Sequence, residues 1–138
     1  MKLVVHTDGG ARGNPGPAAI GVVIEIIQNS KFKIQNEIEI SRRIGETTNN
    51  VAEYTAVVEA LKNIKGGENT TIDFFLDSTL VVNQLNGLFK VKDAKLRELL
   101  SQIQILEQEA GGVITYTSVP REKNQRADFL VNQALDRT

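Results

Sequence analysis

The chain has 138 residues, of which 41% are hydrophobic and 24% charged, with a net charge of −1 and no cysteine. These values are typical of one globular domain, here residues 1–138, and exclude a disordered or disulfide-stabilised chain. No apolar run approaches the roughly 20 residues of a membrane span, and the N-terminus lacks a signal-peptide pattern. We therefore expect a monomeric cytoplasmic protein with no membrane association and no obligatory protein partner.

The first 41 residues have the pattern of three consecutive antiparallel strands. Val- and Ile-rich runs at Leu3–Thr7 and Ala19–Ile27 are followed by strict alternation over Phe32–Ser41, which is the period of a half-exposed strand. A glycine- and proline-rich loop, Gly9–Pro17, separates the first two strands, and Asn29-Ser30 is a plausible hairpin turn before the third.

After residue 48 the pattern changes to alternating helices and strands. Apolar residues recur at helical spacing, and glycine pairs follow two of the predicted helices. The expected helices are Asn49–Lys65, Ser78–Asn86, Lys95–Ala110 and Asn124–Asp136, and the expected strands are Thr71–Leu76 and Val113–Val119. Three strands followed by alternating helix and strand predict an α/β domain with a mixed sheet covered by helices.

Four acidic residues fall at the ends of these elements or at the border of an apolar helix face. Asp8 ends the first strand, Asp77 ends the fourth, and Glu53 and Asp128 border the apolar faces of the first and last helices. Each has an ordinary structural explanation, such as a turn residue, a helix cap or a first-turn acid. Glu53 fits such an explanation least well, because a helix usually places glutamate on its exposed face.

If the first and fourth strands are neighbours, Asp8 and Asp77 meet at one edge of the sheet and the two helices can add Glu53 and Asp128. Clustered carboxylates repel each other, and hard divalent cations relieve that repulsion. The arrangement would suit two-metal phosphoryl chemistry.

Four segments of the sequence together resemble a known family. They read TDGGARGNPGP, TTNNVAEYTAVVEAL, DSTLVVNQLNG and VPREKNQRADFLVNQAL, in this order from Thr7 to Leu135. In motif content and order the chain is similar to type 1 ribonuclease H, in a form without the basic protrusion that many bacterial members carry.

The resemblance implies a ribonuclease H-like fold: a five-stranded mixed sheet, its first three strands antiparallel, with helices on both faces. It also implies endonucleolytic cleavage of the RNA strand of RNA–DNA hybrids, leaving 5′-phosphates, with two Mg2+ or Mn2+ ions. By the same resemblance Asp8 would bridge both metals, Glu53 and Asp77 would hold the metal near the leaving group, and Asp128 would hold the metal that activates water.

The substrate-binding motifs of the family also have counterparts here. Glycines allow a backbone to approach the minor groove closely, and amides can both donate and accept hydrogen bonds. For Thr48 a phosphate contact and a plain helix cap are alternatives, and for Arg12 the sequence does not choose between a phosphate contact and solvation of the loop. The expected substrate-binding residues are Gly9, Gly10, Arg12, Gly13, Asn14, Thr48, Asn49 and Asn50.

The sequence departs from the family pattern in three ways. The loop before the last helix lacks the histidine of many members, because the only histidine, His6, lies in the first strand as an expected structural residue. Arg121, Glu122 and Lys123 are candidate replacements, and we weakly favour Arg121, which could steady phosphate charge but could not act as a base. There is no tryptophan, and a modest cationic stretch replaces the basic protrusion at Lys90, Lys92, Lys95 and Arg97.

Two other classes of function remain open. A non-catalytic nucleic-acid-binding module could share the fold, although such a copy would be expected to have lost one of the acids. A transposase, integrase or junction-resolvase core would be expected to differ in acid spacing and to lack the GNPGP and TNN segments.

Overall fold

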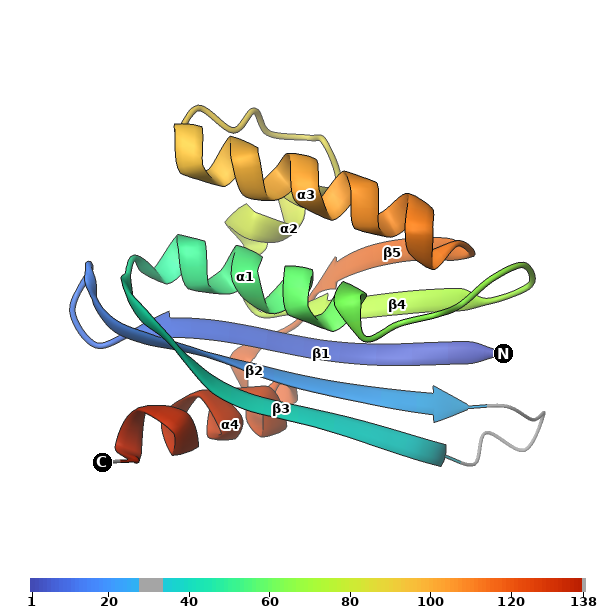
Figure 1. Ribbon diagram of the computed structural model, residues 1–138, viewed down its shortest axis with the longest axis horizontal. Coiled ribbons are helices and arrows are strands. Elements are labelled where there is room, and N and C mark those ends of the chain that lie inside the picture. The colour runs from blue at the N-terminus through green and yellow to red at the C-terminus, as the bar shows by residue number, and fades with distance from the viewer. Residues whose placement is uncertain (28–33, 138) are drawn as a thin grey trace.

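The computed structural model describes residues 1–27 and 34–137. A five-stranded sheet of order β3-β2-β1-β4-β5 runs through its centre (Figure 1). The strands β1, β2 and β3 are antiparallel, whereas β1, β4 and β5 run parallel. The elements are β1 (Lys2–Ala11), β2 (Gly16–Ile27), β3 (Ile34–Thr47), α1 (Asn49–Lys62), β4 (Thr71–Leu76), α2 (Thr79–Leu85), α3 (Ala94–Ala110), β5 (Val113–Ser118), the short 3-10 helix η1 (Arg121–Lys123) and α4 (Gln125–Asp136). The α/β fold expected from the sequence is confirmed.

The β1–β2 hairpin is longer than predicted. β1 does not end at Asp8, because backbone pairing continues to Ala11 opposite Ala18. The expected loop Gly9–Pro17 is therefore reduced to residues 12–15. Glycine has a low strand propensity, which hid the extension, but its backbone forms ladder hydrogen bonds like that of any other residue.

The third strand extends to Thr47, six residues beyond the predicted end at Ser41. β3 lies at the edge of the sheet, where polar residues are tolerated. Its last residues therefore lack the apolar alternation from which a strand is predicted. The predicted start at Phe32 and the Asn29-Ser30 turn lie outside the described residues.

The remaining boundaries agree closely with the sequence. The strand β4 is as predicted, and α2, α3, α4 and β5 differ by one residue at their ends. The helix α1 ends at Lys62 and not at Lys65, and η1 was not predicted because three residues carry no periodic pattern. No helix in the described part of the chain is both long and apolar enough to cross a membrane.

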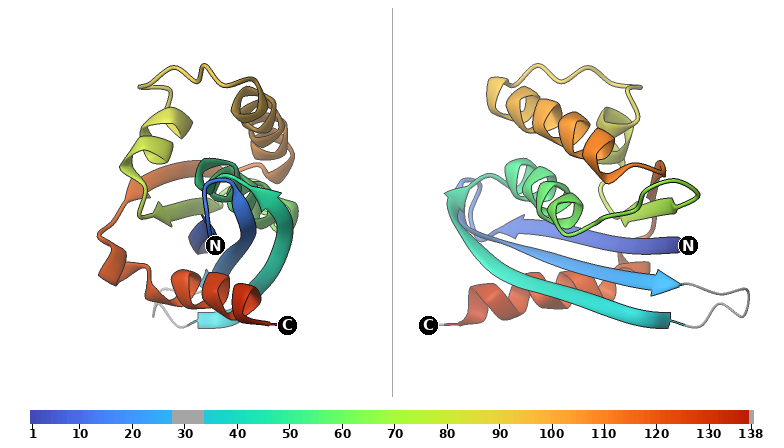
Figure 2. Two further views of the ribbon diagram at one scale, coloured as in Figure 1. Left: turned by 90° about the vertical axis from the view of Figure 1, so that its left-hand side faces the viewer. Right: turned by 45° about the vertical axis from the view of Figure 1, so that its right-hand side comes forward.

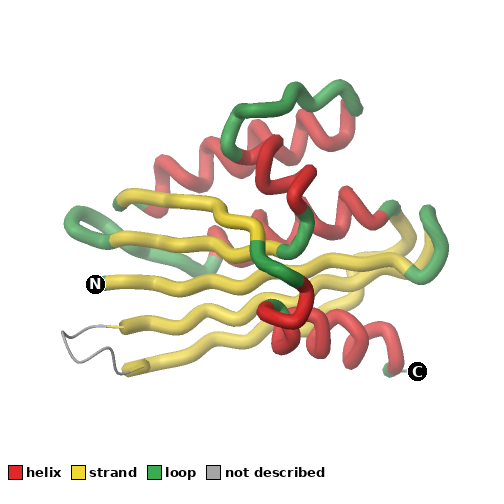
Figure 3. Tube along the Cα trace, turned by 180° about the vertical axis from the view of Figure 1, so that it is seen from behind, coloured by secondary structure: helices red, strands yellow, loops and turns green. Residues whose placement is uncertain are grey.

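The helices cover the two faces of the sheet unequally. On one face α1 packs on β1 and β2, and α3 packs on α1 (Figure 2). On the other face α4 crosses β1, β2 and β3 (Figure 3). The strand β3 holds α4 through Ser41 Oγ, which donates to the Leu130 carbonyl (2.6 Å), and through Arg43, which donates to the Ala134 and Leu135 carbonyls (3.0 and 2.7 Å). The two Arg43 bonds satisfy carbonyls at the C-terminal end of α4.

Two glycines allow the helices to approach the sheet closely. A Cβ on Gly9 would lie 2.2 Å from the Ala52 carbonyl carbon in α1, and a Cβ on Gly21 would lie 2.1 Å from the Ala127 carbonyl oxygen in α4. Gly21 is paired with Asp8, and Gly9 is the next residue of β1. Both helices are therefore in backbone contact with the sheet beside Asp8, one on each face.

We expect Gly21→Ala to destabilise the protein by about 1–3 kcal/mol, because the methyl group must push α4 off β2. The free energy of unfolding, measured by urea denaturation, checks this. Gly10→Ala is the matched control, since its Cβ would meet only Val131 Cγ1 at an ordinary 3.5 Å. Equal stability of the two variants would contradict the close-packing argument.

Candidate active site

The acidic residues of β1 and β4 meet where these two parallel strands separate. The last β1–β4 pair is His6–Phe75, and Asp8 and Asp77 follow it along their strands. Polar side chains gather readily at the carboxyl ends of adjacent parallel strands. The predicted meeting of Asp8 and Asp77 is therefore confirmed, although Asp8 lies inside its strand and not at its end.

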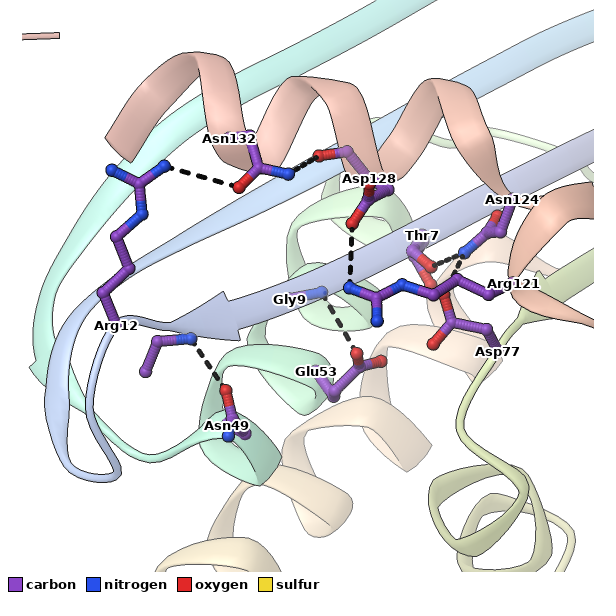
Figure 4. A network of polar contacts seen from close by, with 11 residues as sticks. Thr7, Gly9, Arg12, Asn49, Glu53, Asp77, Arg121, Asn124, Asp128 and Asn132 are labelled. Carbon is purple, nitrogen blue, oxygen red and sulfur yellow. Dashed lines mark hydrogen bonds and ion pairs between the residues drawn. The ribbon is translucent and has the colours of Figure 1, made fainter. Parts of the chain in front are cut away.

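The helix α1 adds Glu53 to this pair. Because Gly9 has no side chain, α1 lies against β1, and the Gly9 N–H donates to Glu53 Oε1 at 3.3 Å (Figure 4). Carboxylate oxygens of Asp8, Glu53 and Asp77 all lie within 4.8 Å of one another. Asp8 and Glu53 are each only 7% exposed, so their charges are largely removed from water.

Asp128 borders the three-carboxylate cluster without belonging to it. It projects from the first turn of α4 and lines the same cavity. Its Oδ1 accepts from Arg121 Nη2 at 3.4 Å, and the arginine side chain is 80% exposed. The structure thus brings Arg121 to the site, as the sequence suggested, but through Asp128.

Burial and mutual repulsion disfavour ionisation of the clustered acids. Burial first, and then the charges of Asp77 and Asp128, raise the pKa of Asp8 to about 7. Burial and the adjoining Asp8 likewise raise the pKa of Glu53 well above its usual range. The cluster therefore holds negative charge at an energetic cost that a bound cation would remove.

The donor set fits a hard divalent cation. All three close ligands are carboxylates, which Mg2+ and Mn2+ prefer. Glu53 Oε2 is buried and has no hydrogen-bond partner within the described part of the chain. Such an orphaned buried oxygen is expected where a ligand normally completes the site.

A cavity of about 380 Å³ opens over the acids and is also bordered by several of the predicted substrate residues. Gly9, Gly10, Arg12, Asn49 and Asn50 line it, whereas Gly13, Asn14 and Thr48 do not. The structure thus separates the predicted set into residues that line the cavity and residues that do not.

Two of the residues that do not line the cavity, Asn14 and Thr48, hold the start of α1 in place. Thr48 is the N-cap of α1, and its Oγ1 accepts from the Val51 N–H at 3.2 Å. Asn14 Oδ1 accepts from the Asn49 N–H (3.0 Å), and Asn49 Oδ1 accepts from the Ala11 N–H (2.8 Å). Because backbone N–H groups require an oxygen acceptor, both amides are fixed with their oxygens turned to the protein.

Asn124 is a site residue that the sequence did not reveal. Its side chain is 1% exposed, and its Nδ2 donates to the Thr7 carbonyl (2.9 Å) and to Asp77 Oδ2 (3.3 Å). It therefore ties the start of α4 to β1 and orients one of the acids. A lone asparagine before a helix looks like a cap, and no sequence signal distinguishes this contact.

Two further sequence expectations concern His6 and a stretch of exposed cations, all outside the cavity. His6 is a sheet residue as predicted, with its ring stacked on Phe75 at 5.2 Å between ring centroids. The expected cationic stretch is exposed in the connection between α2 and α3 and in the first turn of α3, at Lys90, Lys92, Lys95 and Arg97.

Comparison with known proteins places the chain in a family. The reverse transcriptase-like family matches residues 6–134. LC11-RNase H1, isolated from compost by a metagenomic approach, is 45% identical, with a TM-score of 0.85 over 98% of this chain and 96% of that chain. Its complex with an RNA/DNA hybrid aligns with a TM-score of 0.80.

Two further relatives are longer than this chain. The bifunctional protein Rv2228c of Mycobacterium tuberculosis is 40% identical over 99% of this chain, which spans only 36% of that relative. Ribonuclease HI of Halobacterium salinarum is 38% identical over 98% of this chain and 65% of its own length. RNase H1 from the same archaeon has a solved structure that aligns with a TM-score of 0.82 over 98% of that chain. By sequence and fold, the chain belongs to the type 1 ribonuclease H family.

Proposed function

We propose that the protein is a metal-dependent endonuclease that hydrolyses the RNA strand of RNA–DNA hybrids. The observation that carries this proposal is the convergence of Asp8, Glu53 and Asp77 within 4.8 Å at the floor of an open cavity. All four acids of the family pattern are present, which argues against a non-catalytic binding module. The hybrid complex of LC11-RNase H1 supports the choice of substrate.

The four acids would hold two Mg2+ or Mn2+ ions. When bound, these cations would supply an activated water and stabilise the charge that develops on the leaving oxygen. Asp8 and Glu53 supply buried carboxylates, Asp77 supplies a partly buried one, and Asp128 supplies a partly exposed one at the rim. Asn124 keeps Asp77 in place, and Arg121 brings positive charge to the side where the substrate phosphate enters.

The β1–β2 turn and the start of α1 would bind the hybrid in its minor groove. With the oxygens of Asn14 and Asn49 committed to backbone N–H groups, the amide NH2 groups are left as donors. Donors suit both the 2′-hydroxyls of the RNA strand and the acceptor-rich minor-groove edges of the bases. Because most of those acceptors are shared by all base pairs, the binding would depend little on sequence.

The exposed cations at the start of α3 would give a weak, salt-sensitive grip on the phosphate backbone. Action as a single-domain monomer in the cytoplasm remains a prediction from the sequence.

The wild-type protein should cut the RNA strand of a hybrid in Mg2+ or Mn2+ and leave DNA duplex intact. Asp8→Asn should reduce cleavage by more than about a hundredfold, because it removes a ligand charge while keeping the side-chain shape. Cleavage of a labelled hybrid under both metals measures this.

Asp73→Asn is the matched control, an identical change on β4 at an acid outside the cluster. It should cleave like the wild type. Full activity of Asp8→Asn, or no cleavage by the wild type with either metal, would refute the assignment.

The stability of the metal-free protein should fall as the pH rises. The folded protein loses the Asp8 proton near pH 7, whereas the unfolded chain loses it near the ordinary pKa of 3.8. Between these values the folded state holds the extra proton, so the free energy of unfolding decreases with increasing pH. We expect a loss on the order of 2 kcal/mol between about pH 5 and about pH 8.

Urea denaturation in a chelator, repeated with added Mg2+, measures this effect. Mg2+ should restore the stability at the higher pH, and Asp8→Asn should reduce both the pH dependence and the response to Mg2+. Stability that rises with pH in the chelator would show that the acids are not mutually destabilising.

Arg121→Ala should lower cleavage by roughly twofold to tenfold, well below the effect of Asp8→Asn, because an exposed arginine contributes modestly. Steady-state cleavage of the hybrid measures the loss. Lys123→Ala, an exposed cation in the same 3-10 helix, is the control and should change little. An unchanged rate in Arg121→Ala would remove this residue from the site.

A further inference from the structure

Arg12, at the rim of the acid-lined cavity, is paired with the last residue of α4. Its Nη2 donates to Asp136 Oδ1 at 2.6 Å and to Asn132 Oδ1 at 3.4 Å (Figure 4 shows the Asn132 contact). The two charged side chains are 49% and 66% exposed. The pair is therefore accessible to a ligand that competes for the arginine.

The two partners of Arg12 extend the line of α4 that begins at the site. Asp128, Asn132 and Asp136 follow one another at four-residue spacing, and the Asn132 Nδ2 donates to the Asp128 carbonyl at 3.2 Å. Residues at this spacing share one side of a helix, and eight residues span about 12 Å. Arg12 thus contacts α4 one and two turns beyond Asp128, on the same side of the helix.

Asp136 is poorly placed to stabilise its own helix. A negative charge in the last turn of a helix faces the negative end of the helix dipole and is unfavourable there. The favourable positive charge at this helix end comes from Arg43, which donates to the Ala134 and Leu135 carbonyls. The short contact that Asp136 makes is with Arg12, and a carboxylate presents to a guanidinium the same kind of charged oxygen acceptor as a phosphate.

We propose that Asp136 occupies Arg12 in place of a non-scissile substrate phosphate and thereby weakens binding of the hybrid. This inference rests on the proposed function. When the nucleic acid binds, a phosphate replaces the Asp136 carboxylate as the partner of Arg12. Arg12 therefore contributes less to the affinity for the hybrid than an unpaired arginine would. The exchange needs only side-chain motion, because the Arg12 backbone N–H is fixed to the Pro17 carbonyl at 2.8 Å.

Hybrid binding and cleavage in the wild type, Asp136→Asn, Arg12→Ala and the double variant test this proposal. Asp136→Asn should lower KM, and the Kd measured in chelator by fluorescence anisotropy, by roughly twofold to fivefold at low salt. The effect should fall on KM more than on kcat. Arg12→Ala should raise both constants, and the double variant should match Arg12→Ala.

Glu68→Gln is the charge-matched control, because Glu68 is exposed in the connection before β4, at the opposite end of that strand from Asp77. It should leave KM and Kd unchanged. Thermal unfolding of each variant separates a loss of folding from a change in binding.

Each of the other outcomes contradicts either the inference or the proposed function. If the wild type cleaves the hybrid but Asp136→Asn binds it no better than Glu68→Gln does, the inference is wrong and the proposed function stands. If Asp136→Asn improves binding by the same factor in the Arg12→Ala background as in the wild type, Asp136 acts through its general charge and not through the arginine. If the wild type neither binds nor cleaves the hybrid, the proposed function and the inference fail together.

Discussion

Backbone contact between helix and sheet on both sides of Asp8 is the constraint on which the site depends. Gly9 lets α1 reach β1, and Gly21, opposite Asp8 on β2, lets α4 reach the other face. With a side chain at either position, the helix would have to stand farther from the sheet. Glu53 comes from α1 and Asp128 from α4, so the same two contacts set the spacing of the acids.

This close packing creates an electrostatic cost. The buried positions of Asp8 and Glu53, together with their nearness to Asp77, raise the pKa values of the first two acids. A fold selected for stability alone would replace such residues or pair them with cations. Here the cations of the region, Arg12 and Arg121, lie at the exposed rim of the cavity. This arrangement supports the proposal that a divalent ion binds at the deep position and a substrate phosphate at the rim.

Three asparagines near the site make different kinds of hydrogen bond with the protein. Asn14 and Asn49 direct their oxygens to backbone N–H groups, which leaves their NH2 groups as the donors of the proposed hybrid contact. Asn124 donates inward and joins α4 to β1 and Asp77. The direction of each amide is therefore set by the backbone group that it meets.

The sequence by itself determined the order of the elements and the family, and it predicted the four acids, because hydrophobic period and motif order are local properties of the chain. It misjudged the end of β1 and of β3, where glycines and polar edge residues carry no strand pattern. Only the tertiary structure decided that Asn124 supports Asp77 and that Asp136 pairs with Arg12. These partners are distant in sequence, and their contacts depend on how closely α4 packs against the sheet, which no local pattern encodes.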